Sequence, residues 1–126
     1  MKDTIFDFPL DQIRRRPIRF VSAGVATEYI NDEPVKPGCI HIINRVAIEN
    51  QNHTFTRFRI GVWDGANFHL SYEQKTLAVA TLYHTADPIY LSEGENLRIE
   101  LAGCTLNDIV VAYIDGFVRC GNSARD

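Results

Sequence analysis

Histidine and cysteine are the side chains of this sequence with the widest chemistry, since both bind transition metals and both serve nucleophilic catalysis. The 126 residues include His41, His53, His69, His84, Cys39, Cys104 and Cys120. A metal site of the cupin type needs a His-x-His pair with a downstream acid, and neither that pair nor a Cys-x-x-Cys pair occurs. His41 and His69 would meet only if their strands paired. The sequence therefore predicts no metal site, and we expect the histidines to lie at the surface or at the rim of the fold.

The cysteine count argues against a disulfide framework. Three is an odd number, and Asp3 and Asp7 interrupt the apolar stretch that a secretory leader would need. A soluble chain made in the cytosol keeps its thiols reduced. We therefore expect Cys39, Cys104 and Cys120 to be small apolar residues in or near strands.

Sequence motifs of catalysis are missing. There is no Gly-x-Ser-x-Gly elbow, no Walker loop and no Gly-x-Gly-x-x-Gly fingerprint. Asp64, Asp87, Asp108 and Asp115 all occupy predicted turns, where aspartate accepts hydrogen bonds from its own backbone. A glycosidase-type carboxylate pair is the remaining catalytic alternative. Because turn chemistry accounts for these acids, we expect no enzyme and no cofactor.

Aromatic and arginine side chains offer binding chemistry instead. Five aromatic residues would form a platform for the apolar faces of sugars, or would fill a core or a subunit interface, which is the favoured interpretation. They are Trp63, Phe68, Tyr72, Tyr83 and Tyr90. Arg57 and Arg59 share one outward strand face. That arrangement suits a subunit interface because arginine binds carboxylates bidentately; the alternative is a solvated face.

Alternating hydrophobicity is the main structural signal from residue 17 onward. Apolar and polar residues alternate around Ile40–Ile48, Phe58–Val62 and Leu97–Leu101, which indicates strands with one buried face. Residues 109–114 are apolar on both parities, as expected for a central strand covered on both sides. Asp115-Gly116, directly after them, is expected to form a bulge or a turn.

These strands, with turn signals such as Pro-Gly and Asp-Gly between them, predict an all-β fold. We expect an antiparallel, jelly-roll-like β-sandwich of about eight short strands over residues 17–120. Residues 121–126 are expected to form a flexible tail.

Residues 1–16 differ from the rest and are expected to form an extended N-terminal arm. Residues 1–20 carry five basic against three acidic side chains, a net +2, and the remainder carries eight against thirteen, a net −5. An extended arm does not bury large apolar side chains on itself, so we expect it to dock on this domain or on a neighbouring subunit. The expected interface residues are Phe6, Phe8, Leu10, Ile13, Arg14, Arg15 and Arg16, with Arg57 and Arg59.

The segment Asp87–Leu101, followed by Gly103 and Asp108–Phe117, resembles the C-terminal half of small β-sandwich virion proteins of tailed bacteriophages. In this chain and in those proteins, an apolar strand, an acidic-Gly turn, an alternating strand and a final apolar strand follow in that order. The resemblance implies a structural role as a head decoration (cement) protein or as a neck or tail component. Such a protein is made in the host cytoplasm and incorporated into the virion.

By this resemblance the chain would bridge neighbouring subunits non-covalently, with the arm as clasp. Its partners would be major capsid, neck or tail proteins, and it would form a homo-oligomer. The alternative is a carbohydrate-binding or receptor-binding β-sandwich module. A net charge of −3 and the lack of a long apolar run predict neither direct nucleic-acid binding nor a membrane partner.

Overall fold

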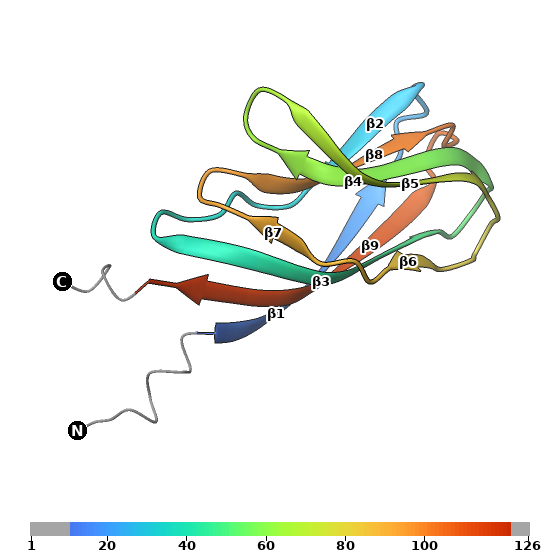
Figure 1. The fold of residues 1–126 in the computed structure, drawn as a ribbon. Helices are drawn as coiled ribbons and strands as arrows, with labels where there is room; N and C mark the ends of the chain where they lie inside the picture. The colour runs from blue at the N-terminus through green and yellow to red at the C-terminus, as the bar shows by residue number, and fades with distance from the viewer. Residues whose placement is uncertain (1–10, 122–126) are drawn as a thin grey trace.

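The computed structural model describes residues 11–121, which form nine β-strands and no helix (Figure 1). The strands are β1 (Asp11–Val21), β2 (Thr27–Asn31), β3 (Cys39–Asn50), β4 (Phe55–Trp63), β5 (Phe68–Leu77), β6 (Tyr83–Thr85), β7 (Ile89–Leu91), β8 (Asn96–Ala102) and β9 (Ile109–Cys120). The all-β class is therefore as predicted. No helical segment with the length and hydropathy of a membrane span occurs among these residues.

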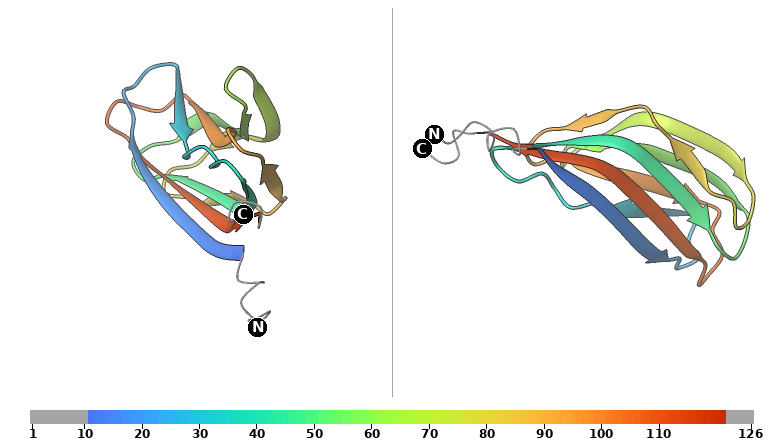
Figure 2. Two further views of the ribbon diagram at one scale, coloured as in Figure 1. Left: turned by 90° about the vertical axis from the view of Figure 1, so that its left-hand side faces the viewer. Right: turned by 90° about the horizontal axis from the view of Figure 1, so that it is seen from below.

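The strands form two antiparallel sheets that pack face to face (Figures 1 and 2). Sheet A contains β1, β9, β3 and β6 in that order, with β7 also paired to β3, and sheet B contains β2, β8, β4 and β5. The chain crosses between the sheets after β1, β2, β3, β5, β7 and β8, which is the wrapping of a jelly roll. The predicted antiparallel β-sandwich is thus confirmed.

Side chains that point inward from both sheets form a single core. Sheet B contributes Phe58, Ile60 and Ile99, and sheet A contributes Ile48 and Ile114; all five are almost inaccessible to solvent. Burying a large apolar side chain stabilises a fold by roughly 1.5–3 kcal/mol. This core holds the two sheets rigidly, so their outer faces present side chains in fixed positions.

Strand β1 begins earlier than the predicted sandwich domain. Residues 11–16 pair with β9 in continuous register, from Asp11 opposite Arg119 to Arg16 opposite Ile114. They belong to sheet A rather than to an arm. The rest of the predicted arm, with Phe6, Phe8 and Leu10, lies outside the described residues, as do residues 122–126 of the predicted tail.

The expectation of unpaired cysteines is wrong for two of the three. Cys39 and Cys120 stand directly opposite each other on β3 and β9, with their Cα atoms 4.0 Å apart, and form a disulfide. The two residues are 81 positions apart, so only the pairing of the strands brings them together. Cys104 is a buried free thiol, as expected.

The irregularity expected at Asp115-Gly116 lies on the opposite strand. Both residues continue β9, while the register of β3 shifts between Ile43 and Arg45 directly across from them. A side chain at position 116 would overlap the carbonyl group of Ile42. Glycine is therefore required here because the backbone of β3 approaches too closely for a Cβ.

Candidate functional site

The outer face of sheet A carries a continuous row of apolar side chains. Strand register places Ile13 of β1 and Ile42 of β3 on either side of Phe117 of β9. Tyr90 of β7 lies on the far side of Ile42. Ile13 and Tyr90, at the two ends, are 70% and 66% exposed. Directly opposed residues share one face of a sheet, so these four residues, here called the apolar row, form one surface.

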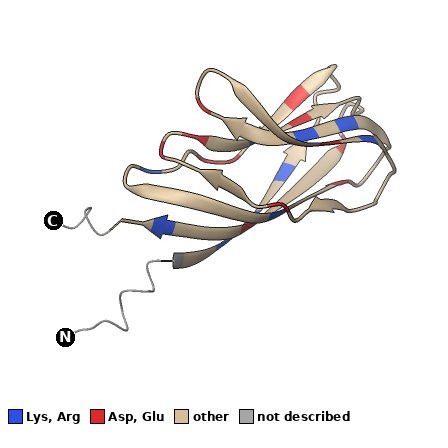
Figure 3. Cartoon of the chain, in the orientation of Figure 1, with Lys and Arg blue, Asp and Glu red and all other residues tan. Residues whose placement is uncertain are grey.

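Nothing among residues 11–121 covers this face. Figure 2 shows β1, β9 and β3 side by side in front of sheet B, with no described segment in front of them. Strand β9 is apolar on both sides, with Val110 and Ile114 inward and Tyr113 and Phe117 outward. Strand β9 is central in its sheet, as predicted. The segment that was expected to cover its outer side is absent from the described part of the chain. Figure 3 shows few charged residues along β3 and β9.

A hollow of about 170 Å³ adjoins one end of the apolar row. It lies at the bulge of β3, where β1, β9 and β3 meet, and is lined by Ile13, Arg15, Asn44, Asp115, Gly116 and Phe117. Asp115, one of the lining residues, forms an ion pair with Arg45 at 3.0 Å. The hollow therefore offers an incoming side chain two apolar walls and a polar rim.

Two of the predicted interface arginines, Arg14 and Arg16, form ion pairs within the chain. Arg14 donates to both carboxylate oxygens of buried Asp32, at 2.7 and 2.6 Å, and Arg16 lies 2.8 Å from the same carboxylate. Burial would lower the pKa of Arg14, but the hydrogen bonds and charge of Asp32 and Glu33 outweigh it, and the pKa is raised. These contacts tie β1 to the segment after β2. Arg15 is exposed on the outer face.

The other two predicted arginines belong to a ladder of charges on the outer face of sheet B. Register aligns Arg59 of β4 with Glu100 of β8 on one side and Glu73 of β5 on the other. Arg57 reaches the same two carboxylates, at 3.3 Å from Glu100 and 4.0 Å from Glu73. The role of Arg57 and Arg59 at a subunit interface stays a prediction.

A second feature of this face is a stack of two aromatic rings around an arginine. The Arg98 guanidinium carbon lies 3.9 Å from the ring centroid of Trp63 and 4.8 Å from that of Tyr29. On β8, Arg98 stands between Asn96, which is opposite Trp63, and Glu100, which is opposite Tyr29. The two rings thus flank the guanidinium from opposite directions along the strand.

The five predicted platform aromatics do not form one surface. Tyr72 and Tyr83 pack against the core beside Phe58, as the favoured interpretation expected. Tyr90 is on sheet A, and Trp63 stands opposite Phe68 on sheet B. The sequence analysis did not single out Tyr29, which stacks on Arg98. Its strand is short, and only the register of β2 with β8 places Tyr29 beside Arg98.

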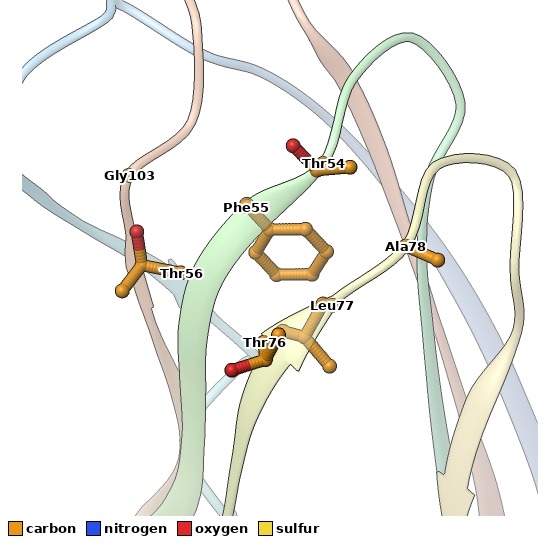
Figure 4. Close-up of a pocket in the computed structure, with 7 residues that line it drawn as sticks. All are labelled: Thr54, Phe55, Thr56, Thr76, Leu77, Ala78 and Gly103. Carbon is orange, nitrogen blue, oxygen red and sulfur yellow. The ribbon is translucent and has the colours of Figure 1, made fainter.

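A hollow of about 550 Å³ lies where the start of β4, the end of β5 and Gly103 converge (Figure 4). The rings and methyls of Phe55 and Leu77 form its floor, and Thr54, Thr56 and Thr76 contribute hydroxyl groups. Thr76 has a φ of 61°, which is strained for a β-branched residue. None of the lining residues ionises, so the hollow offers hydrogen bonds and apolar contact but no acid–base chemistry.

One histidine departs from the predicted surface location. His41 is only 4% exposed, and its Nδ1 has no hydrogen-bond partner among the described residues. Burial, and then the charge of Arg14, lower its pKa, against the opposing charges of Asp32 and Glu33. It lies on β3 in sheet A, whereas His69 lies on β5 in sheet B, so the two do not meet.

The remaining histidines are exposed and two of them pair with turn aspartates. His69 contacts Asp64, whose other oxygen accepts hydrogen bonds from the backbone of the tight turn, as predicted for that acid. His53 contacts buried Asp108. The described residues contain no group of three or more His, Cys, Asp or Glu arranged to hold a metal ion.

Comparison with known proteins leaves the family open. No protein-family model and no curated protein matches the chain. A chain from the structure of infectious bursal disease virus, Gx strain, has 10% identity and a TM-score of 0.48, covering 88% of this chain and 33% of that chain. A chain from a study of CBM4 structure and function has 9% identity and a TM-score of 0.37, covering 83% of this chain and 82% of that chain.

A third solved structure, dimeric latent PorU from Porphyromonas gingivalis, has 8% identity and a TM-score of 0.45. It covers 86% of this chain and 13% of that chain. The present chain therefore spans a third or less of two of these three neighbours. With all three TM-scores below 0.5, we base no functional argument on the likenesses, and the resemblance to phage virion proteins stays a prediction.

Proposed function

We propose that the protein is a structural subunit of a virion that holds neighbouring capsid, neck or tail subunits together by non-covalent contacts. The observation that supports this most directly is the apolar row on the outer face of sheet A. A contiguous apolar surface with aromatic residues, on a rigid sheet, is typical of a protein interface. The chain would be made in the host cytoplasm and act once incorporated into the particle.

The first partner in this proposal is a second copy of the chain. Tyr90 projects at one end of the apolar row, and the hollow beside Ile13 lies at the other end. A two-fold axis between them would place the Tyr90 ring of each copy at the hollow of its partner. Closed symmetric dimers are built from such self-complementary surfaces.

The N-terminal segment is the proposed clasp. Strand β1 pairs only with β9 among the described strands, so its other backbone edge is free to accept a further strand. Burial of Phe6, Phe8 and Leu10 on a neighbour would contribute roughly 1.5–3 kcal/mol each before ordering costs. Because residues 11–16 are part of the sandwich, the clasp is best assigned to residues 1–10.

Sedimentation equilibrium over a wide range of protein concentration tests the self-association. We expect a reversible oligomer whose dissociation constant rises by about tenfold or more in Tyr90→Ser and in Ile13→Ser. Leu106→Ser is the matched control, since Leu106 is a comparably exposed apolar residue in the β8–β9 loop. A wild-type chain that stays monomeric throughout, or a control that weakens association equally, would contradict this interface.

Incorporation into particles tests the virion role separately. The chain, and a form lacking residues 2–10, would be co-expressed with the major capsid protein of the same genome. We expect the complete chain to co-sediment with assembled shells and the shortened form to be lost from them. Absence of the complete chain from shells and from neck and tail fractions would overturn the virion role.

Carbohydrate binding is the second candidate function, and the stack of Tyr29, Arg98 and Trp63 favours it. Aromatic rings on an exposed sheet face are the groups that pack on the apolar faces of sugar rings. A glycan array probed with the wild-type chain and with Trp63→Ala tests it. Binding that is lost in the variant supports this function, and a wild-type array without hits removes it.

A further inference from the structure

The Arg98 side chain is held in one orientation by three contacts from two other strands. The guanidinium lies over the ring of Trp63 of β4 and over the ring of Tyr29 of β2, and its Nε donates to Asn31 Oδ1 at 2.8 Å. Cation–π contacts and a planar fork of donors make a guanidinium a directional group when it is fixed in this way. Its two terminal nitrogens are the part left to bind something else, since no described residue accepts from them.

The polar groups beside Arg98 are also arranged as donors. Asn31 Oδ1 accepts from Arg98 Nε and, at 3.4 Å, from Asn96 Nδ2, so the oxygen of its amide faces the protein and its Nδ2 remains a donor. The adjacent acid, Glu100, is paired with Arg57 and Arg59. Arg98 and Asn31 therefore present donors and positive charge, which favours an anionic ligand.

The charge of the whole face agrees with this selection. Its outward-facing strand residues include four cations, Arg57, Arg59, Lys75 and Arg98, against two anions, Glu73 and Glu100. An anion that approaches the outer face of sheet B thus meets a net positive surface, although the chain as a whole carries −3.

Apolar groups border the fixed guanidinium on the side of β4 and β5. Arg98 stands opposite Gly61, whose missing side chain leaves the Phe68 ring close to the backbone there. Beyond Gly61, Leu70 is 53% exposed. A ligand that places a charge on Arg98 would therefore rest a flat apolar face on Phe68 and Leu70.

We propose that this stack binds the carboxylate of an acidic saccharide, a sugar ring of the uronic or sialic type. The carboxylate would accept hydrogen bonds from the Arg98 terminal nitrogens and from Asn31 Nδ2, and the C–H face of the ring would pack on the aromatic border. This inference rests on the second proposed function, carbohydrate binding, and names its ligand class.

Intrinsic fluorescence is a direct reporter, because Trp63 is the only tryptophan of the chain. Trigalacturonate and 3′-sialyllactose are the acidic probes, and the trimethyl ester of trigalacturonate and lactose are their neutral counterparts. We expect at least one acidic probe to change the fluorescence saturably, its neutral counterpart to bind about tenfold more weakly or worse, and added salt to weaken binding.

Two arginine variants separate a specific site from general attraction. Arg98→Gln should weaken binding of the acidic probe by about tenfold or more, while Arg57→Gln, which removes the same charge from the same face, should leave it nearly unchanged. Arg98→Lys should also weaken binding, because lysine keeps the charge but loses the fork and the stacking. Near-ultraviolet circular dichroism of each variant checks that the sandwich is intact.

The outcomes distinguish the proposal from its alternatives. Equal binding of acidic and neutral probes would overturn the acidic-ligand inference while keeping carbohydrate binding. Failure of every probe, together with a glycan array without hits, would overturn both. If sodium sulfate or phosphate competed with the acidic probe at equal concentration, the feature would be an inorganic anion site, which would overturn the proposal. An unchanged affinity of Arg98→Gln for the acidic probe would place the ligand elsewhere and would also overturn it.

Discussion

At the scale of single residues, some ionisable side chains of this protein stabilise loops. Asp108 is the clearest case, since its buried carboxylate accepts from the Asn50 amide and from the backbone N–H of Thr105, and contacts His53. One acid thereby joins the β3–β4 loop to the β8–β9 loop. The turn location predicted for Asp108 is correct, but two of its partners, Asn50 and His53, lie 58 and 55 residues earlier in the chain.

Asp108 gives a pH-dependent prediction. Desolvation raises its pKa, but hydrogen bonds from Asn50, His53 and Thr105 outweigh this and hold the pKa below its ordinary value. A depressed folded-state pKa means that the stabilisation is present above the unfolded-state pKa of about 3.9 and is lost as the pH falls through the folded-state value. Asp108→Asn should therefore lower the free energy of unfolding by about 1–3 kcal/mol at neutral pH.

Urea unfolding at neutral pH and at about pH 3 measures this effect, and the difference from wild type should narrow at the lower pH. Asp87→Asn, a change at an exposed turn aspartate, is the control and should change little at either pH. A difference between wild type and Asp108→Asn that is the same at both pH values would show that the carboxylate charge plays no part.

Cys104 is predicted to be unreactive in the folded protein. Burial, and then the charges of Glu28 and Asp108, raise the pKa of its thiol to about 11. The thiolate is the reactive species, so iodoacetamide should label no cysteine at neutral pH in the folded state. In denaturant without reductant, mass spectrometry should show one label per chain. Rapid labelling of the folded protein would contradict this environment for the thiol.

At the scale of elements, strand register decides which residues act together. The apolar row, the charge ladder and the stack around Arg98 each contain residues from three or more strands. The hairpin of β4 and β5 is local and was predictable from Asp64-Gly65. The pairing of β3 with β9 joins distant segments, and it creates both the disulfide and the surface of the apolar row.

The disulfide should be a major contributor to stability. Joining Cys39 to Cys120 closes a loop of 81 residues, and cross-links of long loops restrict the unfolded chain. The double variant Cys39→Ser, Cys120→Ser should lose about 2–4 kcal/mol in free energy of unfolding. Dithiothreitol should lower wild-type stability to a similar degree and leave the double variant unchanged; equal sensitivity of both proteins would contradict the assignment.

At the scale of the whole molecule, one body carries two distinct outer faces. The face of sheet A carries the apolar row and suits another protein subunit, whereas that of sheet B carries the charge ladder and Arg98 and suits a soluble anionic ligand. Because the core separates them, the two proposed functions are independent, and a variant in one face should leave the other intact.

Two N-terminal deletions should separate the clasp from the sandwich. Removing residues 2–10 leaves all of β1 in place, so the thermal transition should stay nearly unchanged. Removing residues 2–16 deletes half of β1 and leaves the buried Asp32 without Arg14 and Arg16. The free energy of unfolding should fall by about 3 kcal/mol or more, because an uncompensated buried charge is strongly destabilising. Differential scanning calorimetry measures both, and equal transitions would show that residues 11–16 are dispensable.

The sequence by itself determined the β class, most strand positions and the buried faces of β4 and β8, because a two-residue period reports which side of a strand is buried. The single buried face predicted for Ile40–Ile48 was wrong at its start, since the bulge between Ile43 and Arg45 reverses the alternation, so that Ile42 faces outward and His41 is buried. It also located local turns such as Asp64-Gly65. Only the tertiary structure decided that Cys39 meets Cys120, that Arg14 binds Asp32 and that Tyr29 and Trp63 enclose Arg98. Periodicity carries no information about which strand lies alongside, and that choice is made by packing the two sheets around one core.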